Sequence, residues 1–195
     1  KITTREHTEK MFEQFDIPIN ISRSKGKKLI KLDPVEGFNP KNLNICGDFS
    51  SASFFILAAL ITPNSELLLK NVGVNPTRTG FLHALRHMGA NITLQNETDS
   101  YEPTADILVK TSELKGIVLN TNLVANMIDE MPAFFIAASL ATGTTKVKEA
   151  KELRTKESDR LQAMSEVLDS FGVQFQLEAD GIVIKGIGKG GTLKA

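Results

Sequence analysis

The chain has 195 residues, of which 41% are hydrophobic and 24% are charged, the composition of a globular protein with a sizeable core. Its 23 basic and 23 acidic residues cancel, so the overall charge gives no reason to expect nucleic acid or an anionic membrane as a partner. Any affinity for anions must therefore come from local clusters of charge.

The first predicted element is an amphipathic helix followed by a strand, within residues 7–21. Thr4 and Arg5 stand at the start of this helix, where Arg5 could bind an anion or simply belong to a solvated helix end. Residues 22–45 then carry a basic turn and a link rich in proline, asparagine and glycine. This change in composition predicts a domain junction near residues 45–47.

Beyond the junction the sequence predicts helices that are apolar nearly all round. One is SSASFFILAAL, after Gly47 and Asp48, and the other is MPAFFIAASLA, at residues 131–141. A helix without a polar face must be buried on all sides. Each of the two helices is followed by a predicted strand, at residues 66–72 and 144–150.

An amphipathic helix comes next in both cases and repeats the pattern of residues 7–21. Residues 78–94 and 158–177 each contain a helix, a short break and a strand, and the break is Gly89 or Gly172. The pattern recurs about every 75–80 residues, which is too long for a solenoid repeat. The sequence therefore predicts an α/β (α+β) fold made of a few modules around shared buried helices.

Two charged segments precede predicted helices and allow two interpretations. Asp129 and Glu130 stand before Pro132, where an acidic residue commonly caps a helix. Residues 71–80, NVGVNPTRTG, could cradle a phosphate, but their glycines do not have the spacing of a P-loop, so a structural turn is favoured.

The densest cluster of charge is RTKESDR, at residues 154–160. Ser158 and Asp159 could cap the helix that follows, where an acid suits the positive end of the helix dipole. Capping does not account for the cations of the cluster, which are Arg154, Lys156 and Arg160. Cations at a helix start make sense if an anion binds there. Glu157 would then be a carboxylate whose protonation is tuned by its positive neighbours.

The sequence also bears on the cellular setting. Cys46 is the single cysteine, which excludes an internal disulfide and favours a reducing compartment. The apolar stretches are too short to span a bilayer, and residues 1–12 lack the apolar core of a secretory signal. We therefore expect a cytoplasmic protein without a membrane partner, and a plastid location is also compatible with the sequence.

Taken in chain order, these segments resemble the 5-enolpyruvylshikimate-3-phosphate synthase family. The resemblance covers essentially the whole chain and rests on the segments TTREHTE, GDFSSASFF, NVGVNPTRTG, MIDEMP and RTKESDRL. It implies two domains, each with three βαβαββ units around buried helices. Residues 1–45 would end the N-terminal domain with its third unit, and residues 46–195 would supply two of the three units of the C-terminal domain.

The family's reaction transfers the enolpyruvyl group of phosphoenolpyruvate to the 5-hydroxyl of shikimate 3-phosphate and releases phosphate. By resemblance, Asp129 would take the proton of that hydroxyl, and Glu157 would protonate the methylene carbon of phosphoenolpyruvate. Lys156 would lie between the two substrates. No metal or organic cofactor is implied, and His83 and His87, four residues apart on a predicted helix, lack a third metal ligand.

The resemblance also implies substrate-binding roles. Arg160 would hold phosphoenolpyruvate, Arg5 and Thr4 would contact shikimate 3-phosphate, and the three residues with catalytic roles would contact substrate as well. If this interpretation is right, Asp129 and the side chains of residues 156–160 must converge on one side of the molecule. Glu152 stands where some family members have an asparagine near the substrate.

Several substrate-binding residues of the family would lie outside residues 1–195, so the isolated chain is expected to be inactive. The full-length protein is expected to be a monomer. Two alternatives stay open at this stage. One is the related enolpyruvyl transferase that acts on UDP-N-acetylglucosamine, and the other is a non-catalytic α/β module used for association.

Overall fold

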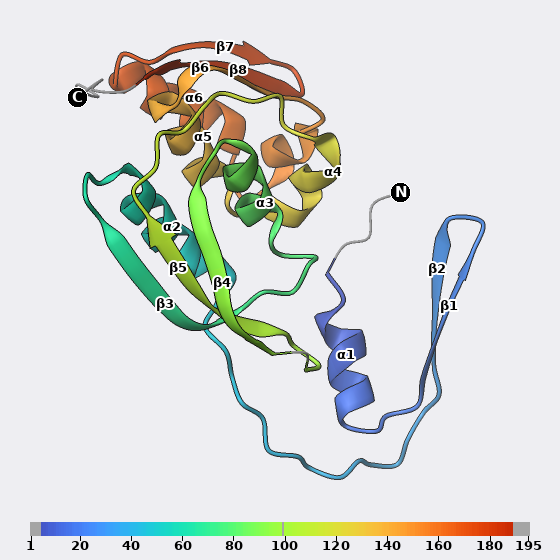
Figure 1. Ribbon diagram of the computed structural model, residues 1–195. Helices are drawn as coiled ribbons and strands as arrows, with labels where there is room; N and C mark the ends of the chain where they lie inside the picture. The colour runs from blue at the N-terminus through green and yellow to red at the C-terminus, as the bar shows by residue number, and fades with distance from the viewer. Residues whose placement is uncertain (1–4, 99, 189–195) are drawn as a thin grey trace.

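The computed structural model describes residues 5–98 and 100–188, and Figure 1 shows how they are arranged. A first segment, residues 5–46, precedes two α/β modules that share one order of elements. The first segment contains helix α1 (His7–Gln14) and an antiparallel hairpin of strands β1 (Ile19–Ser24) and β2 (Lys27–Leu32).

The two modules confirm the element order predicted from the sequence. The α2 module, residues 47–110, contains α2 (Phe49–Ile61), β3 (Glu66–Gly73), α3 (Gly80–His87), β4 (Asn91–Thr98) and β5 (Thr104–Lys110). The α5 module, residues 115–187, contains α4 (Thr121–Val124), η1 (Ala125–Met127), α5 (Met131–Leu140), β6 (Thr142–Val147), η2 (Lys151–Thr155), α6 (Arg160–Ser170), β7 (Gln174–Glu178) and β8 (Gly181–Ile187). Each module has an antiparallel three-stranded sheet whose last strand lies in the middle, in the orders β3-β5-β4 and β6-β8-β7.

The three amphipathic helices end in the same way. The residue at the break after α1, α3 and α6 has a positive φ angle, 57° at Asp16, 92° at Gly89 and 69° at Gly172. Glycine reaches this left-handed region without steric cost, and aspartate tolerates it better than most residues. The chain can therefore turn at once from each helix into the following strand.

Each module begins with isolated β-bridges, and no strand is assigned there among the described residues. Gly47 forms a parallel bridge with Val72 of β3, and residues 115 and 118 form parallel bridges with β6. A Cβ at Gly116 would lie 2.5 Å from the carbonyl oxygen of Thr144, so the two backbones approach as closely as only glycine allows. These isolated bridges stand where the βαβαββ unit implied by the resemblance has its first strand.

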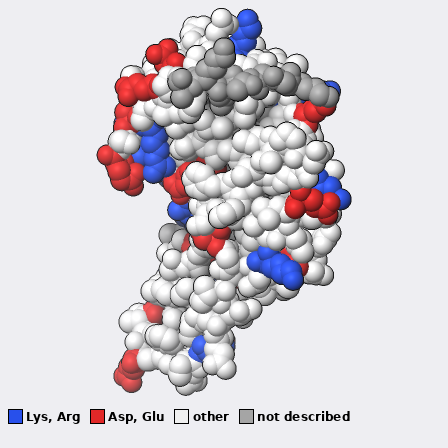
Figure 2. Space-filling model, turned by 90° about the vertical axis from the view of Figure 1, so that its left-hand side faces the viewer, with Lys and Arg blue, Asp and Glu red and all other residues white. Residues whose placement is uncertain are grey.

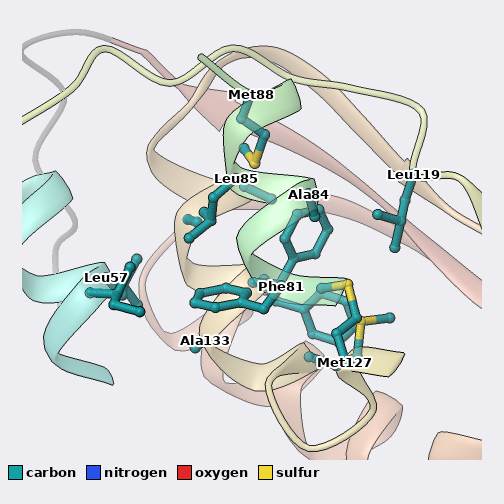
Figure 3. Close-up of a cluster of buried hydrophobic side chains, with 14 of the residues drawn as sticks. Leu57, Phe81, Ala84, Leu85, Met88, Leu119, Met127 and Ala133 are labelled. Atoms are coloured by element: carbon teal, nitrogen blue, oxygen red, sulfur yellow. The ribbon is translucent and has the colours of Figure 1, made fainter. Parts of the chain in front are cut away.

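Helix α5 lies at the centre of a core that both modules share. It packs against α2, α3, α6 and β8, and its Phe134 and Phe135 are fully buried. Figure 3 shows the part of this core around α3, where Phe81 lies between Leu57 of α2 and Met127 of η1. The prediction that an apolar helix is buried on all sides holds for most of α5, but the side that carries Pro132, Ile136 and Leu140 is only partly buried.

The same prediction is wrong for α2. One side of α2 packs on β3, β5 and α5, but Phe54 and Phe55 are 58% and 60% exposed. Figure 2 views the molecule from the side of α2 and β3, and charged residues lie mainly around the margin of this face. Burial depends on which elements pack around a helix, and the described residues cover only one side of this one.

In Figure 1 the β1–β2 hairpin lies apart from the modules, whereas α1 lies beside the turn between β4 and β5, where His7 pairs with Glu102. Residues 33–46, all of them described, connect β2 to the α2 module without helix or strand. A division into domains near residues 45–47 stays a prediction. Within the described residues, no helix has both the length and the apolar character needed to cross a membrane.

The shared core yields a stability prediction. Phe81→Ala removes a fully buried ring at the junction of α2, α3 and α5, and we expect it to lower the free energy of unfolding by about 3–5 kcal/mol. The control Phe54→Ala changes an exposed ring and should alter this free energy by about 0.5 kcal/mol or less. Urea denaturation of the chain, followed by circular dichroism, measures both; equal losses would contradict the described core.

Candidate active site

Asp129 lies in the turn between η1 and α5, at the start of the central buried helix. Its carboxylate accepts hydrogen bonds from two arginines: Arg5 binds Oδ2, and Nη1 of Arg160 lies 3.3 Å from Oδ1. In the part of the chain that the structure describes, no side chain caps α5. The capping interpretation of Asp129 is therefore wrong, and its side chain faces a cluster of cations instead.

The start of α6 combines a cap with a structural arginine. Asp159 caps the helix by accepting a hydrogen bond from the backbone N–H of Gln162 at 2.9 Å, as the capping interpretation predicted. Arg154 donates to Oδ2 of Asp159 at 2.8 Å and to the backbone carbonyls of Glu178 and Ala179. Arg154 therefore has partners within the protein, and its guanidinium ties the start of α6 to the β7–β8 turn. That Arg154 faces an anionic ligand stays a prediction.

Arg160, the first residue of α6, connects two acidic residues. Its Nη2 lies 2.9 Å from Oε2 of Glu157, and its Nη1 binds Asp129. The two carboxylates come from the turns before α5 and before α6. A single guanidinium therefore joins the two residues that the sequence analysis singled out for proton transfer.

Lys156 lies in the same cluster of charge but has a different partner. Its Nζ lies 2.9 Å from Oε1 of Glu152, one helical turn earlier in the chain. The structure thus brings Arg5, Asp129, Glu157 and Arg160 into one network and directs Lys156 to Glu152.

Hydrogen bonds and neighbouring cations lower the pKa of both acids. Burial raises the pKa of Asp129, but the hydrogen bonds and charges of Arg5 and Arg160 outweigh it, so the pKa lies below its ordinary value. The pKa of Glu157 is also lowered, first by the hydrogen bond from its own backbone N–H and then by Arg160. Both groups are ionised at neutral pH.

This arrangement suits the binding of anions. Arginine forms strong charge-assisted hydrogen bonds with carboxylates and phosphates alike, so an anionic ligand can replace Asp129 or Glu157 as the partner of Arg160. Glu157 is 84% exposed, which leaves room for such an exchange. Across the described residues, no group of three or more His, Cys, Asp or Glu side chains is placed to hold a metal ion.

Comparison with known proteins gives the family. The family described as EPSP synthase (3-phosphoshikimate 1-carboxyvinyltransferase) matches residues 2–195, nearly the whole chain. The chain belongs to the EPSP synthase family. The resemblance noted in the sequence is therefore confirmed.

Relatives and solved structures agree with this assignment. The chain is 41% identical to a 3-phosphoshikimate 1-carboxyvinyltransferase of Endomicrobium trichonymphae and 46% identical to one of Legionella pneumophila, over 96% and 94% of its length. It is similar to the structure of EPSP synthase from Acinetobacter baumannii, with a TM-score of 0.88 and 43% identity over 96% of the chain. It spans 42% to 43% of the length of these three proteins.

The roles assigned to single residues stay predictions. Thr4, expected to contact substrate, lies outside the described residues. The sequence analysis gave Glu130 no role beyond a possible helix cap, yet it is 2% exposed and accepts a hydrogen bond from Ser50. The signal that could have revealed it is a second charged residue directly before a helix that has no polar face.

The Arg160 network yields a prediction about protonation. In the wild type, the lowered pKa of Asp129 means that its ion pairs stabilise the folded chain at neutral pH and lose this effect as the pH falls below about 4. Arg160→Gln removes a cation from both acids, so we expect the pKa of Asp129 and that of Glu157 to rise. A carbon-13 NMR titration of the carboxyl groups measures both values.

The control is Arg86→Gln, because Arg86 donates to the backbone carbonyl of Ile92 and contacts neither acid. It should leave both titrations unchanged. Unchanged pKa values in Arg160→Gln would contradict the network.

Proposed function

We propose that this chain forms part of a 3-phosphoshikimate 1-carboxyvinyltransferase, which transfers the enolpyruvyl group of phosphoenolpyruvate to the 5-hydroxyl of shikimate 3-phosphate and releases phosphate. Family membership and the names of the curated relatives support the proposal. The observation that carries it is the guanidinium of Arg160, which binds both Asp129 and Glu157. Since the chain spans only part of its relatives, the activity is proposed for the full-length enzyme.

Asp129 is proposed as the base that takes the proton of the 5-hydroxyl. A base must be ionised before the reaction, and the lowered pKa of Asp129 provides this at neutral pH. The same hydrogen bonds weaken Asp129 as a base. A substrate anion that engages Arg5 or Arg160 removes those bonds and raises the proton affinity of Asp129. Binding of the substrates would therefore activate the base.

Glu157 is proposed as the acid that protonates the methylene carbon. It must carry a proton at that moment, whereas in the chain without substrate its pKa is lowered. A bound anion that takes Arg160 away and brings negative charge close would raise the pKa of Glu157. One exchange of partners at Arg160 thus prepares both proposed proton-transfer groups.

The remaining roles concern charge neutralisation. Arg160 is proposed to hold phosphoenolpyruvate, and Arg5, together with Thr4, to hold shikimate 3-phosphate. Lys156 is proposed to leave Glu152 and lie between the two substrates, which repel each other unless their charges are compensated. Each of the three cations with a described partner would exchange a carboxylate of the protein for an anionic group of substrate.

We also propose that residues 1–45 end one domain and that residues 46–195 form two units of the next. The connection over residues 33–46, which contains no helix or strand, supports this division. The full-length enzyme is proposed to act as a monomer in the cytoplasm, where a single cysteine suits a reducing environment. UDP-N-acetylglucosamine as the acceptor is not favoured, because the curated relatives are named for the shikimate reaction.

Substitution of the two acids tests the catalytic proposal. In the full-length enzyme we expect Asp129→Asn and Glu157→Gln each to lower kcat about 100-fold or more, the usual effect of removing a group that transfers a proton. Steady-state assays of phosphate release measure this effect. The control Glu166→Gln changes an α6 residue that binds only Gln162 among the described contacts, and it should leave kcat unchanged. Wild-type turnover of both acid variants would favour a non-catalytic association module.

The chain by itself provides a second test. Because it spans less than half of its relatives, we expect residues 1–195 alone to release no phosphate from phosphoenolpyruvate and shikimate 3-phosphate, while the full-length enzyme does so in the same assay. Circular dichroism establishes that the chain is folded.

Full-length turnover with UDP-N-acetylglucosamine instead of shikimate 3-phosphate would overturn the proposed acceptor.

A further inference from the structure

A second network of polar side chains involves Glu130, the residue that follows Asp129 in the chain. Glu130, the next residue, is 2% exposed, and its Oε1 accepts a hydrogen bond from Oγ of Ser50 at 2.5 Å. Nη2 of Arg78 lies 2.6 Å from the same Oγ. Two adjacent residues thus have separate partners. Asp129 binds the arginines of the candidate site, whereas the buried Glu130 binds Ser50.

The direction of these hydrogen bonds follows from chemistry. A guanidinium can only donate, so Ser50 must use a lone pair to accept from Arg78. Its single proton is then available for Glu130, whose carboxylate accepts it. Arg78, Ser50 and Glu130 therefore form a directed relay, and Oδ1 of Asp48 also accepts from Arg78, at 3.3 Å.

The relay joins three elements that are distant in sequence. Arg78 lies in the turn before α3, Ser50 in the first turn of α2, and Glu130 directly before α5. The backbone of Glu130 adds two hydrogen bonds, from its N–H to the carbonyl of Met127 and from the N–H of Phe134 to its own carbonyl. Together these bonds hold both the backbone and the side chain of the residue that follows Asp129.

Stability alone gives little reason for this arrangement. Burial raises the pKa of Glu130, although Ser50 and Arg78 act in the opposite direction. Buried charges of this kind can often be replaced by apolar side chains without loss of stability. What the relay does provide is a defined position for the peptide unit between Glu130 and Asp129.

We propose that Glu130 is a positioning residue that holds the Asp129 carboxylate opposite Arg160 through its hydrogen bond to the Arg78–Ser50 pair. The inference rests on the proposed function, in which Asp129 accepts a proton. A shift of about 1 Å in a reacting group can cost roughly 100-fold in rate, so a firm anchor one residue away is directly useful.

The test is a double-mutant cycle in the full-length enzyme, with kcat and both KM values measured by phosphate release. We expect Glu130→Ala to lower kcat by about 10- to 100-fold and to change each KM by less than about threefold. Combined with Asp129→Asn it should cause no further loss, because the effect passes through Asp129. Glu130→Gln, whose carbonyl oxygen can still accept from Ser50, should recover most of the activity.

Two controls separate this role from general stability. Ser50→Ala breaks the same relay at its middle and should give the same dependence on Asp129, which decides the question if Glu130→Ala does not fold. Ser170→Ala removes a hydroxyl that donates to the carbonyl of Val167 on α6 and should leave kcat unchanged.

The outcomes are distinct. Equal losses with and without Asp129, or wild-type kcat in folded Glu130→Ala, would overturn the positioning role. Wild-type kcat in Asp129→Asn would instead overturn the proposed function itself.

Discussion

The apolar character of α5 is the constraint on which the rest of this structure depends. A helix without a polar face is stabilised by burial, and α2, α3, α6 and β8 bury all of α5 except the partly exposed side with Pro132, Ile136 and Leu140. Burial of α5 brings the starts of α2 and α5 and the turn before α3 together. The polar residues at these starts, including the buried Glu130, are thereby collected at one end of the core.

Electrostatics then divides these polar residues into two groups. An inner group consists of the buried Glu130 with the partly buried Ser50 and Arg78, whereas an outer group pairs Asp129 with Arg5 and Arg160. The inner group has fixed partners inside the fold. The outer group has partners that an anion from solution can replace, since arginine binds phosphate as readily as it binds carboxylate.

The sequence predicts those parts of the fold that depend on local pattern. Helical spacing followed by Gly89 or Gly172 was sufficient to locate α3, α6 and the strands after them, because periodicity and turn chemistry are properties of neighbouring residues. The cap at Asp159 could be predicted for the same reason. Motif similarity then placed Asp129 and Glu157 among the candidates.

Features that depend on tertiary neighbours could not be predicted. The exposure of Phe54 depends on what packs against α2, and the engagement of Arg154 depends on where the β7–β8 turn arrives. Glu130 was interpreted as no more than a possible cap, because that is the ordinary explanation of a charged residue before a helix. Only the coordinates show that its partner is a serine 80 positions earlier in the chain.

The pairing of Arg5 with Asp129 has a wider consequence. Arg5 belongs to the first segment, which reaches the α2 module through residues 33–46, while Asp129 is anchored in the shared core. If the first segment swings away, Asp129 loses a counter-ion and its proton affinity changes with that movement. The pKa of Asp129 therefore depends on the distance between the first segment and the modules.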